Sequence, residues 1–203
     1  MKIGVLGGTF DPVHVGHLIL ANESYYQLGL TRILWVLTPN PPHKTDKAIL
    51  DWRQRWRLLE LAFAGNDVFE LCDVDTRRAP PFYAVETLQI LRNKYPDDQL
   101  IYLVGGDSLR DLPTWHHPQE LIDLCDGLGV MMRPDVAIDT QKLEMFIPGI
   151  QKKLLLVSTK PVDISSSSIR SRIANGQPYR YLLPPAVYEY IQDNQLYLVV
   201  CQT

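Results

Sequence analysis

The stretch GVLGGTFDPVHVGHL (residues 4–18) joins an apolar run to a helix-like segment through a glycine-rich turn. Its glycine pair lets the backbone turn tightly and approach a ligand without an intervening Cβ. Thr9 adds a hydroxyl, while His14 and His17 lie one helical turn apart and can face the same group. Because free N–H groups and the helix dipole favour negative charge at a helix start, the stretch predicts a phosphate site.

Outward from this stretch, short apolar runs alternate with helix-like segments. The runs that predict strands are 2–7, 32–37, 68–74, 100–105, 128–132 and 153–158. The segments with helical spacing between them are 16–29, 51–65, 84–95 and 118–125. Continuous apolar runs suit parallel strands that are covered on both faces. The alternation therefore predicts an α/β fold with a doubly wound, mostly parallel sheet.

After residue 160 the sequence is helical in pattern, at 165–176 and 184–194, with no strand pattern that could found a second core. We therefore expect a single domain over residues 1–203, with 160–203 as a helical C-terminal part packed on it.

Two glycine pairs follow expected strands, Gly7-Gly8 after the first and Gly105-Gly106 after the fourth. In doubly wound sheets, ligands bind beyond the carboxyl ends of the strands, where the strand order reverses. If these two strands are neighbours, both turns face one crevice. The sequence does not establish that they are.

Composition excludes several classes of protein. The chain has 203 residues, 46% of them apolar and 21% charged, and a net charge of -3, so no overall basic field attracts nucleic acid or anionic membrane. Cys72, Cys125 and Cys201 are scattered, which favours reduced thiols over a disulfide framework or a zinc site, and the first two sit in apolar surroundings. With no secretory signal or membrane-length apolar run, we expect a soluble, cytoplasmic protein.

Taken alone, H-x-x-H is a weak signal. Two histidines near a helix start are often surface residues, and zinc would need further ligands that no partner motif supplies. A second segment, ISSSSIRSRI (164–173), has similar ambiguity. Its serines can cap a helix and cradle phosphate, and Arg170 can grip phosphate oxygens, although a plain cap with a solvated arginine is the simpler alternative.

The two segments together resemble the signatures of the nucleotidyltransferase superfamily with the HxGH motif, whose fold is Rossmann-like and shared with class I aminoacyl-tRNA synthetases. GGTFDPVHVGH matches the first signature, and ISSSSIR resembles the second, I-S-S-T-x-I-R, with Ser167 where threonine is usual. In that superfamily the two histidines bind the triphosphate of ATP.

Three further segments narrow the family: TPNPPHK (38–44), LVGGDSLRDLPTWHHPQEL (103–121) and YRYLLPPAVYEYIQDNQLY (179–197). A lysine near the crevice can neutralise phosphate, a carboxylate after a strand can accept bonds from ribose or adenine, and a tryptophan can stack on a flat ring. Each also has a structural alternative, as a surface lysine or a tryptophan that fills a gap. The segments resemble bacterial nicotinate-nucleotide adenylyltransferases, over nearly the whole chain.

The resemblance implies roles for particular residues. The implied catalytic residues are His14, His17, Lys44 and Arg170. Those implied to bind ATP are Gly8, Thr9, Phe10, His14, His17, Gly105, Asp107, Ile164, Ser167 and Arg170. Those implied to bind the second substrate are His43, Lys44, Thr87, Trp115 (by stacking on the nicotinate ring) and Arg133. No residue is implied as a metal ligand.

Two positions depart from the family pattern. PFYAVETL (81–88) stands where S-Y-T-x-x-T-L is common, so Ala84 replaces a threonine expected at the pyridine carboxylate. Main-chain amides or Thr87 are the alternatives for recognising that acid. Gly106 stands where alanine is more usual.

The implied reaction is adenylyl transfer from ATP to nicotinate mononucleotide, with Mg²⁺ held by phosphates and water. A nicotinamide mononucleotide or phosphopantetheine adenylyltransferase is the alternative within the fold, and a non-catalytic ATP sensor is the alternative outside enzymes. The tryptophans and arginines of DWRQRWR (51–57) suggest nucleic-acid binding as a further alternative, but their helical spacing predicts one packed face and one solvated basic face. The sequence leaves the oligomeric state open, a homo-oligomer included.

Overall fold

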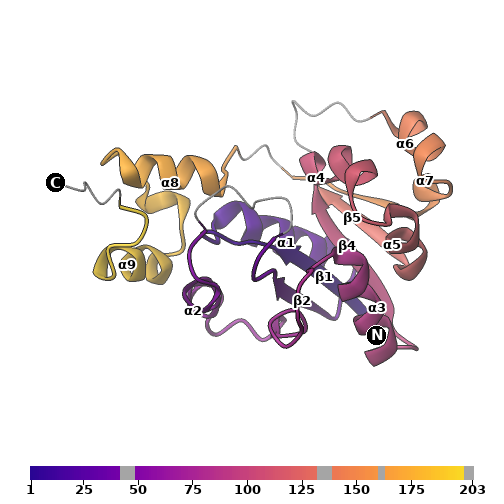
Figure 1. Cartoon of the computed structure of the whole chain (residues 1–203), viewed down its shortest axis with the longest axis horizontal. Coiled ribbons are helices and arrows are strands. Elements are labelled where there is room, and N and C mark those ends of the chain that lie inside the picture. Colours follow the sequence, from indigo (N-terminus) through magenta and orange to yellow (C-terminus); the bar gives the residue numbers. More distant parts are fainter. Residues whose placement is uncertain (42–48, 132–138, 160–162, 199–203) are drawn as a thin grey trace.

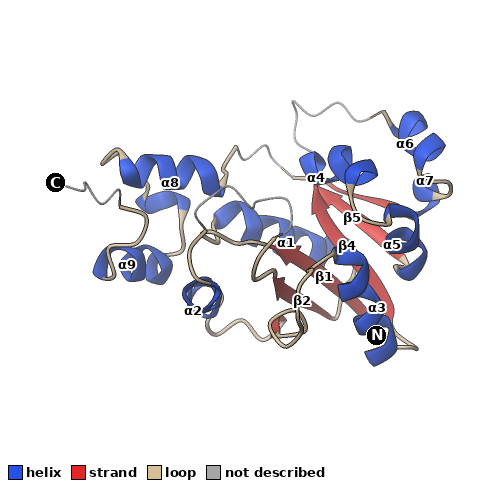
Figure 2. Cartoon of the chain, in the orientation of Figure 1, coloured by secondary structure: helices blue, strands red, loops and turns tan. Residues whose placement is uncertain are grey.

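The computed structural model of this chain describes residues 1–41, 49–131, 139–159 and 163–198. A six-stranded parallel sheet forms its centre, with helices on both sides (Figure 2). The strands are β1 (Lys2–Gly8), β2 (Arg32–Leu37), β3 (Phe69–Cys72), β4 (Gln99–Gly105), β5 (Gly127–Met131) and β6 (Leu154–Val157). The helices are α1 (Val15–Gln27), α2 (Trp52–Ala62), α3 (Ala84–Lys94), α4 (Gly106–Asp111), α5 (Pro118–Leu124), α6 (Thr140–Phe146), α7 (Ile150–Lys153), α8 (Ser166–Ala174) and α9 (Pro185–Asp193).

The strands lie in the order β3-β2-β1-β4-β5-β6. Figure 1 labels the central part of this order, β2, β1, β4 and β5. The chain builds outward from β1 to β3, returns to place β4 beside β1, and then builds outward to β6. Residues 2–5 of β1 are in register with residues 99–102 of β4. The strand order therefore reverses between β1 and β4, which confirms the doubly wound fold and places both glycine pairs at the ligand-binding edge of the sheet.

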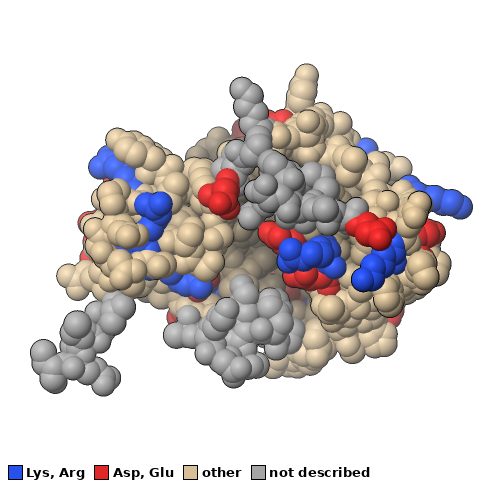
Figure 3. All heavy atoms as spheres, turned by 90° about the horizontal axis from the view of Figure 1, so that it is seen from above, with Lys and Arg blue, Asp and Glu red and all other residues tan. Residues whose placement is uncertain are grey.

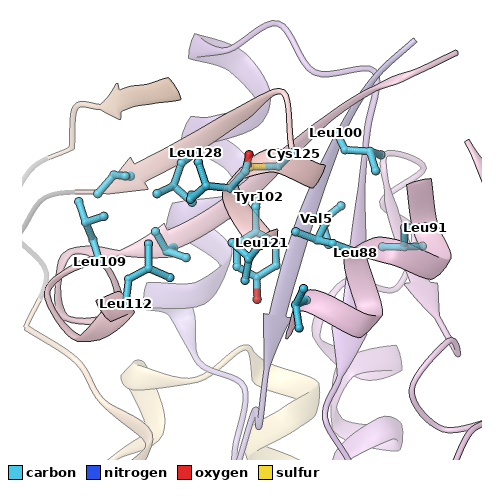
Figure 4. Close-up of a cluster of buried hydrophobic side chains, with 14 of the residues drawn as sticks. Val5, Leu88, Leu91, Leu100, Tyr102, Leu109, Leu112, Leu121, Cys125 and Leu128 are labelled. Atoms are coloured by element: carbon cyan, nitrogen blue, oxygen red, sulfur yellow. The ribbon is translucent and has the colours of Figure 1, made fainter. Parts of the chain in front are cut away.

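Each face of the sheet carries its own apolar cluster. The α3-face cluster packs under α3, α5, α6 and α7, and Figure 4 shows Leu88, Leu121 and Tyr102 within it. The α1-face cluster packs under α1, α2, α8 and α9, with Leu20 and Ile169 among its members. The continuous apolar runs of the strands are explained by this burial on both faces.

The C-terminal helices join the α1-face cluster. Ile169 and Ile173 of α8 and Val187 and Ile191 of α9 are buried in it. This shared core supports the single-domain organisation over 1–203, which remains a proposal. Among the described residues, no helix has the length and apolar character needed to cross a membrane.

Several short elements were not expected from the sequence. These are α4, α6, α7 and two turns of 3-10 helix, Leu112–Thr114 and Arg180–Leu182. With three to seven residues each, they complete at most two turns and show little helical repeat of apolar residues. The other six helices, the seven-residue α5 included, and all six strands lie where the sequence predicts them, within three residues at their ends.

Candidate active site

The turn after β1 ends at two histidines that begin α1. His14 precedes the first turn of α1, and its backbone N–H donates to Nδ1 of His17 (3.2 Å). The two imidazoles stack with their centroids 3.7 Å apart, and His14 is 5% exposed. Both rings therefore lie at the N-terminus of a 13-residue helix, where the dipole favours a bound anion.

Gly8, Thr9 and Phe10 form the turn itself. Phe10 is buried with φ of 47°, and its ring meets the ring of His17 edge-on, with centroids 5.1 Å apart. A Cβ on Gly8 would lie 2.9 Å from the Phe10 ring, so this position needs glycine. The turn thus supports the histidine pair from one side.

The second motif packs directly against the first. Ser166 Oγ at the start of α8 donates to the carbonyl of Pro12 (2.8 Å), and Arg170 Nη1 donates to the carbonyl of Asp11 (2.6 Å). Ser165 caps α8 by accepting from the N–H of Ser168. Two segments more than 150 positions apart are therefore joined at one place.

Ile164 and Ser167 complete this side of the site. The carbonyl of Ile164 lies 3.7 Å from where a Cβ on Gly16 would stand, so the segment just before α8 approaches α1 closely. Ser167 is exposed in the first turn of α8, with its hydroxyl 3.2 Å from that of Ser165. A helix start with an exposed hydroxyl beside the histidines suits a polyanion.

The other expected residues lie after β4. Gly105 ends β4 and precedes α4, and Asp107 in the first turn of α4 forms an ion pair with Arg110 (3.4 Å). Trp115 follows a turn of 3-10 helix and is half-buried, and the ring of Tyr102 stands perpendicular to it at 6.3 Å. These residues occupy the β4 side of the strand-order reversal.

Three expected residues cannot be placed in this way. His43, Lys44 and Arg133 lie outside the described residues. Their roles stay predictions from the sequence.

Comparison with known proteins identifies the family of this chain. Residues 5–172 match the family described as cytidylyltransferase-like. A protein of Thermomicrobium roseum named probable nicotinate-nucleotide adenylyltransferase is 41% identical, with 98% of this chain and 92% of that protein covered. The nicotinate-nucleotide adenylyltransferase of Bacillus subtilis is 37% identical, with 97% and 98% covered. The chain belongs to this adenylyltransferase family.

Solved structures show the same fold. Plasmodium falciparum nicotinic acid mononucleotide adenylyltransferase, in its complex with NaAD, superposes with a TM-score of 0.77 at 18% identity, covering 97% of both chains. A putative nicotinate-nucleotide adenylyltransferase from Vibrio parahaemolyticus superposes with a TM-score of 0.68 at 17% identity, covering 97% of this chain and 96% of that one. The chain thus has the same α/β fold as these adenylyltransferases.

In this adenylyltransferase, Thr87 lies in an internal network at the start of α3. It is 4% exposed, and its hydroxyl donates to Asp75 Oδ1 (2.8 Å). Arg78 also binds Asp75 Oδ1 (2.9 Å) and reaches Glu86 (2.7 Å). Burial raises the pKa of Asp75, and the bonds from Thr87 and Arg78 oppose that rise. The geometry does not favour the expected direct contact of Thr87 with a substrate, because its hydroxyl is already bonded inside the protein.

Arg55 corrects the prediction of a solvated basic face on DWRQRWR. Trp52 and Trp56 do pack against the α1-face cluster, and Arg53 and Arg57 are exposed. Arg55, however, is 1% exposed. It lies three residues after Trp52 and three before Leu58, on the packed side of α2. This helical spacing is the sequence signal that indicates its burial.

The buried guanidinium of Arg55 ties together the turns after β1 and β2. It donates to the carbonyls of Thr9 (2.7 Å), Thr38 (3.0 Å), Leu50 (2.7 Å) and Pro39. Burial lowers the pKa of Arg55, and the Asp11 carboxylate opposes that shift. Arg55 is thus a structural support under the turn that the sequence predicts to bind phosphate.

Asp11 and Tyr197 are also functional candidates that the sequence did not single out. Asp11 is 3% exposed, and Tyr197, beyond α9, donates its hydroxyl to Asp11 Oδ1 (2.9 Å). Asp11 Oδ2 lies 3.7 Å from Arg170 Nη1. Burial, and then the Asp11 charge, raises the pKa of Tyr197, so this hydroxyl stays protonated and donates.

Proposed function

We infer that this chain transfers the adenylyl group of ATP to nicotinate mononucleotide, giving deamido-NAD and pyrophosphate in NAD biosynthesis. The observation that carries the inference is the contact of the two motifs, made by Arg170 with Asp11 and by Ser166 with Pro12. Full-length relatives at about 40% identity that bear the name of this activity support the choice of acceptor.

The reaction needs alignment and charge neutralisation above all. A 5′-phosphate oxygen of the mononucleotide attacks the α-phosphorus of ATP, and the bond from that phosphorus to the bridging oxygen breaks as pyrophosphate leaves. The nucleophile is already an anion, so no general base and no covalent enzyme intermediate are required. We propose that His14, His17 and Arg170 hold the phosphates, because fixed donors and cations stabilise charge without reorganising.

We propose Mg²⁺ as the divalent ion. No three His, Cys, Asp or Glu side chains gather as a metal cage within the part of the chain that the structure describes. The ligands would therefore be triphosphate oxygens and water, which is a typical mode of Mg²⁺ binding. When bound, the ion neutralises phosphate charge.

We propose that the acceptor lies between Trp115 and the start of α3. Trp115 is half-buried with Tyr102 at right angles behind it, an arrangement that leaves part of the indole for stacking. Ala84 is the first residue of α3 and carries no hydroxyl, so recognition of the acid falls to main-chain amides at that helix start.

An acceptor panel tests the function. We expect pyrophosphate release from ATP with nicotinate mononucleotide, and much slower release with nicotinamide mononucleotide or phosphopantetheine. His17→Ala serves as the control for contaminating activity and should abolish most of the signal. A preference for either other acceptor would reassign the substrate, and ATP binding without release for any acceptor would favour the sensor.

We also propose a cytoplasmic location and small molecules, ATP and nicotinate mononucleotide, as the substrates that bind, with a homo-oligomer left open. Free, buried Cys72 and Cys125 fit a reducing compartment. On the face shown in Figure 3, described acidic and basic side chains lie side by side, with no broad basic patch among them. Neither a nucleic-acid partner nor a particular oligomeric state is supported by these features.

A further inference from the structure

We propose that Tyr197 is a positioning residue for the ATP site: its hydroxyl holds the Asp11 carboxylate and thereby keeps Arg170 available to the phosphates. The proposal rests on the function proposed above. It assigns a role in the reaction to a residue at the far end of the sequence, in a segment that follows the last helix.

The Asp11 carboxylate is placed between competing partners. Tyr197 donates to Oδ1 (2.9 Å), while Oδ2 lies 3.7 Å from Nη1 of Arg170. That nitrogen instead donates to the Asp11 carbonyl at 2.6 Å. Asp11 is 3% exposed, so water does little to screen these charges.

Arg170 is anchored at one nitrogen only. Within the described part of the chain, Nη1 is the one atom of its guanidinium that donates a hydrogen bond, and the side chain is 29% exposed. The remaining N–H groups can therefore meet a ligand, and a fork of this kind matches phosphate oxygens. A full ion pair with Asp11 would draw the same fork away from the phosphates.

Tyr197 restrains that competing ion pair. By donating to Oδ1 it satisfies and orients the carboxylate, so that Oδ2 stays in a long ion pair with Arg170 (3.7 Å) and does not take the hydrogen bonds of its guanidinium. The Tyr197 backbone has φ of 65°, and the preceding N–H of Leu196 donates to the carbonyl of Ile191 (3.0 Å), which ties the segment back to α9. Leu196 and Tyr197 also pack against the α1-face cluster, and this packing holds the Tyr197 hydroxyl in a fixed position.

The test is Tyr197→Phe, which keeps the ring and removes the hydroxyl. We expect the KM for ATP to rise about tenfold, as for one lost hydrogen bond to a charged group, with an unchanged KM for nicotinate mononucleotide. The matched control is Tyr190→Phe, since the Tyr190 hydroxyl lies in the same C-terminal part and donates to Gln54 (2.6 Å), away from Asp11. The control should stay within twofold of the wild type.

A double-mutant cycle separates positioning from simple structural support. In an Arg170→Ala background, Tyr197→Phe should have no further effect, because its target is gone. In an Asp11→Asn background it should likewise leave the KM for ATP unchanged, since the amide forms no ion pair with Arg170. An unchanged single variant, equal losses in Tyr190→Phe, or effects that simply multiply in either background would overturn the proposal.

Calorimetric titration with ATP alone tests the role of Tyr197 independently of the proposed function, because the measurement needs no acceptor. The proposal requires weaker ATP binding by Tyr197→Phe whether or not any acceptor reacts. Absence of pyrophosphate release from every acceptor would refute the function, whereas equal ATP affinity of the variant and the wild type would refute the role of Tyr197. Thermal unfolding of each variant checks that the chain is folded. If Tyr197→Phe does not fold, the comparison of Asp11→Asn with wild type carries the test: we expect an unchanged KM for ATP, and a clearly lower KM would overturn the proposal because Asp11 would already draw Arg170 away in the wild type.

Discussion

The stacked rings of His14 and His17 and the guanidinium of Arg170 come from opposite ends of the chain and lie on the same turn. His17 accepts a backbone bond from His14 at Nδ1, which fixes the ring and leaves Nε2 as its donor. Arg170 is fixed by the Asp11 carbonyl. At the scale of single residues, the site is therefore built from side chains whose orientation is set before any ligand binds, the condition under which charge stabilisation is most effective.

Removal of either group proposed to bind phosphate should slow the reaction strongly. We expect His17→Ala and Arg170→Ala each to lower kcat by about a hundredfold or more, as loss of a preorganised donor does in other enzymes. Steady-state pyrophosphate release measures this. Tyr26→Ala is a suitable control because Tyr26 lies on the same helix as His17 and is 82% exposed. Near-normal turnover in both variants would remove these residues from the phosphate site.

Trp115→Ala should act on the other substrate. Because a stacked aromatic contact binds substrate and transition state similarly, we expect a higher KM for nicotinate mononucleotide, by about tenfold, with little change in kcat. The KM for ATP should be unaffected. A change confined to ATP would place Trp115 in the adenine pocket instead.

At the scale of elements, α2 holds the turns after β1 and β2 through one buried cation. Arg55 reaches the carbonyls of Thr9 and Thr38, and each follows a strand of the sheet. A buried charge is stable only when its donors are satisfied, and here main-chain carbonyls satisfy them. The helix α2 therefore positions a turn that we propose to bind ATP, although α2 itself carries none of the proposed ATP-binding residues.

Arg55→Lys tests this support. The charge remains, but an ammonium group cannot present the planar fork that reaches carbonyls of several segments, so we expect a loss of about 2–4 kcal/mol in the free energy of unfolding. Urea denaturation measures the loss. Arg53→Lys on the same helix is the matched control, since Arg53 is exposed and surface pairs contribute little. An unchanged midpoint for Arg55→Lys would contradict the role.

Local pattern explains which elements could be predicted from the sequence. Every strand and long helix is marked by continuous apolar runs or by helical spacing. The two motifs single out His14, His17 and Arg170 as candidates, and their roles stay predictions. The pairing of β1 with β4 joins residues almost 100 positions apart, which no local pattern encodes. Arg55 was misassigned because a cationic side chain on a packed helix face is only explained by carbonyls that other segments bring to it.

At the scale of the whole molecule, the fold brings three distant segments to one edge of the sheet. β1 and β4 meet where the strand order reverses, and α8 returns across the α1 face to place Arg170 there. The contact between Asp11 and Tyr197 could not be predicted from the sequence, because 186 positions separate the two residues and no helical or strand spacing pairs them. The geometry of this edge consequently depends on both packed faces, and a probe buried in one of them reports on the packing of that face.

Cys125 provides such a probe in the α3-face cluster (Figure 4). Burial raises the pKa of its thiol from an ordinary 9.0 to about 11, and because the thiolate is the reactive form, alkylation of native protein at pH 8 should be about a hundredfold slower than that of an unfolded chain. The unfolded thiol ionises first, so the contribution of Cys125 to stability falls as pH rises from 9.0 towards 11. Peptide mass spectrometry after iodoacetamide treatment, with and without urea, measures both states. Rapid native labelling of Cys125 at pH 8 would mean that the α3 face opens locally, without global unfolding.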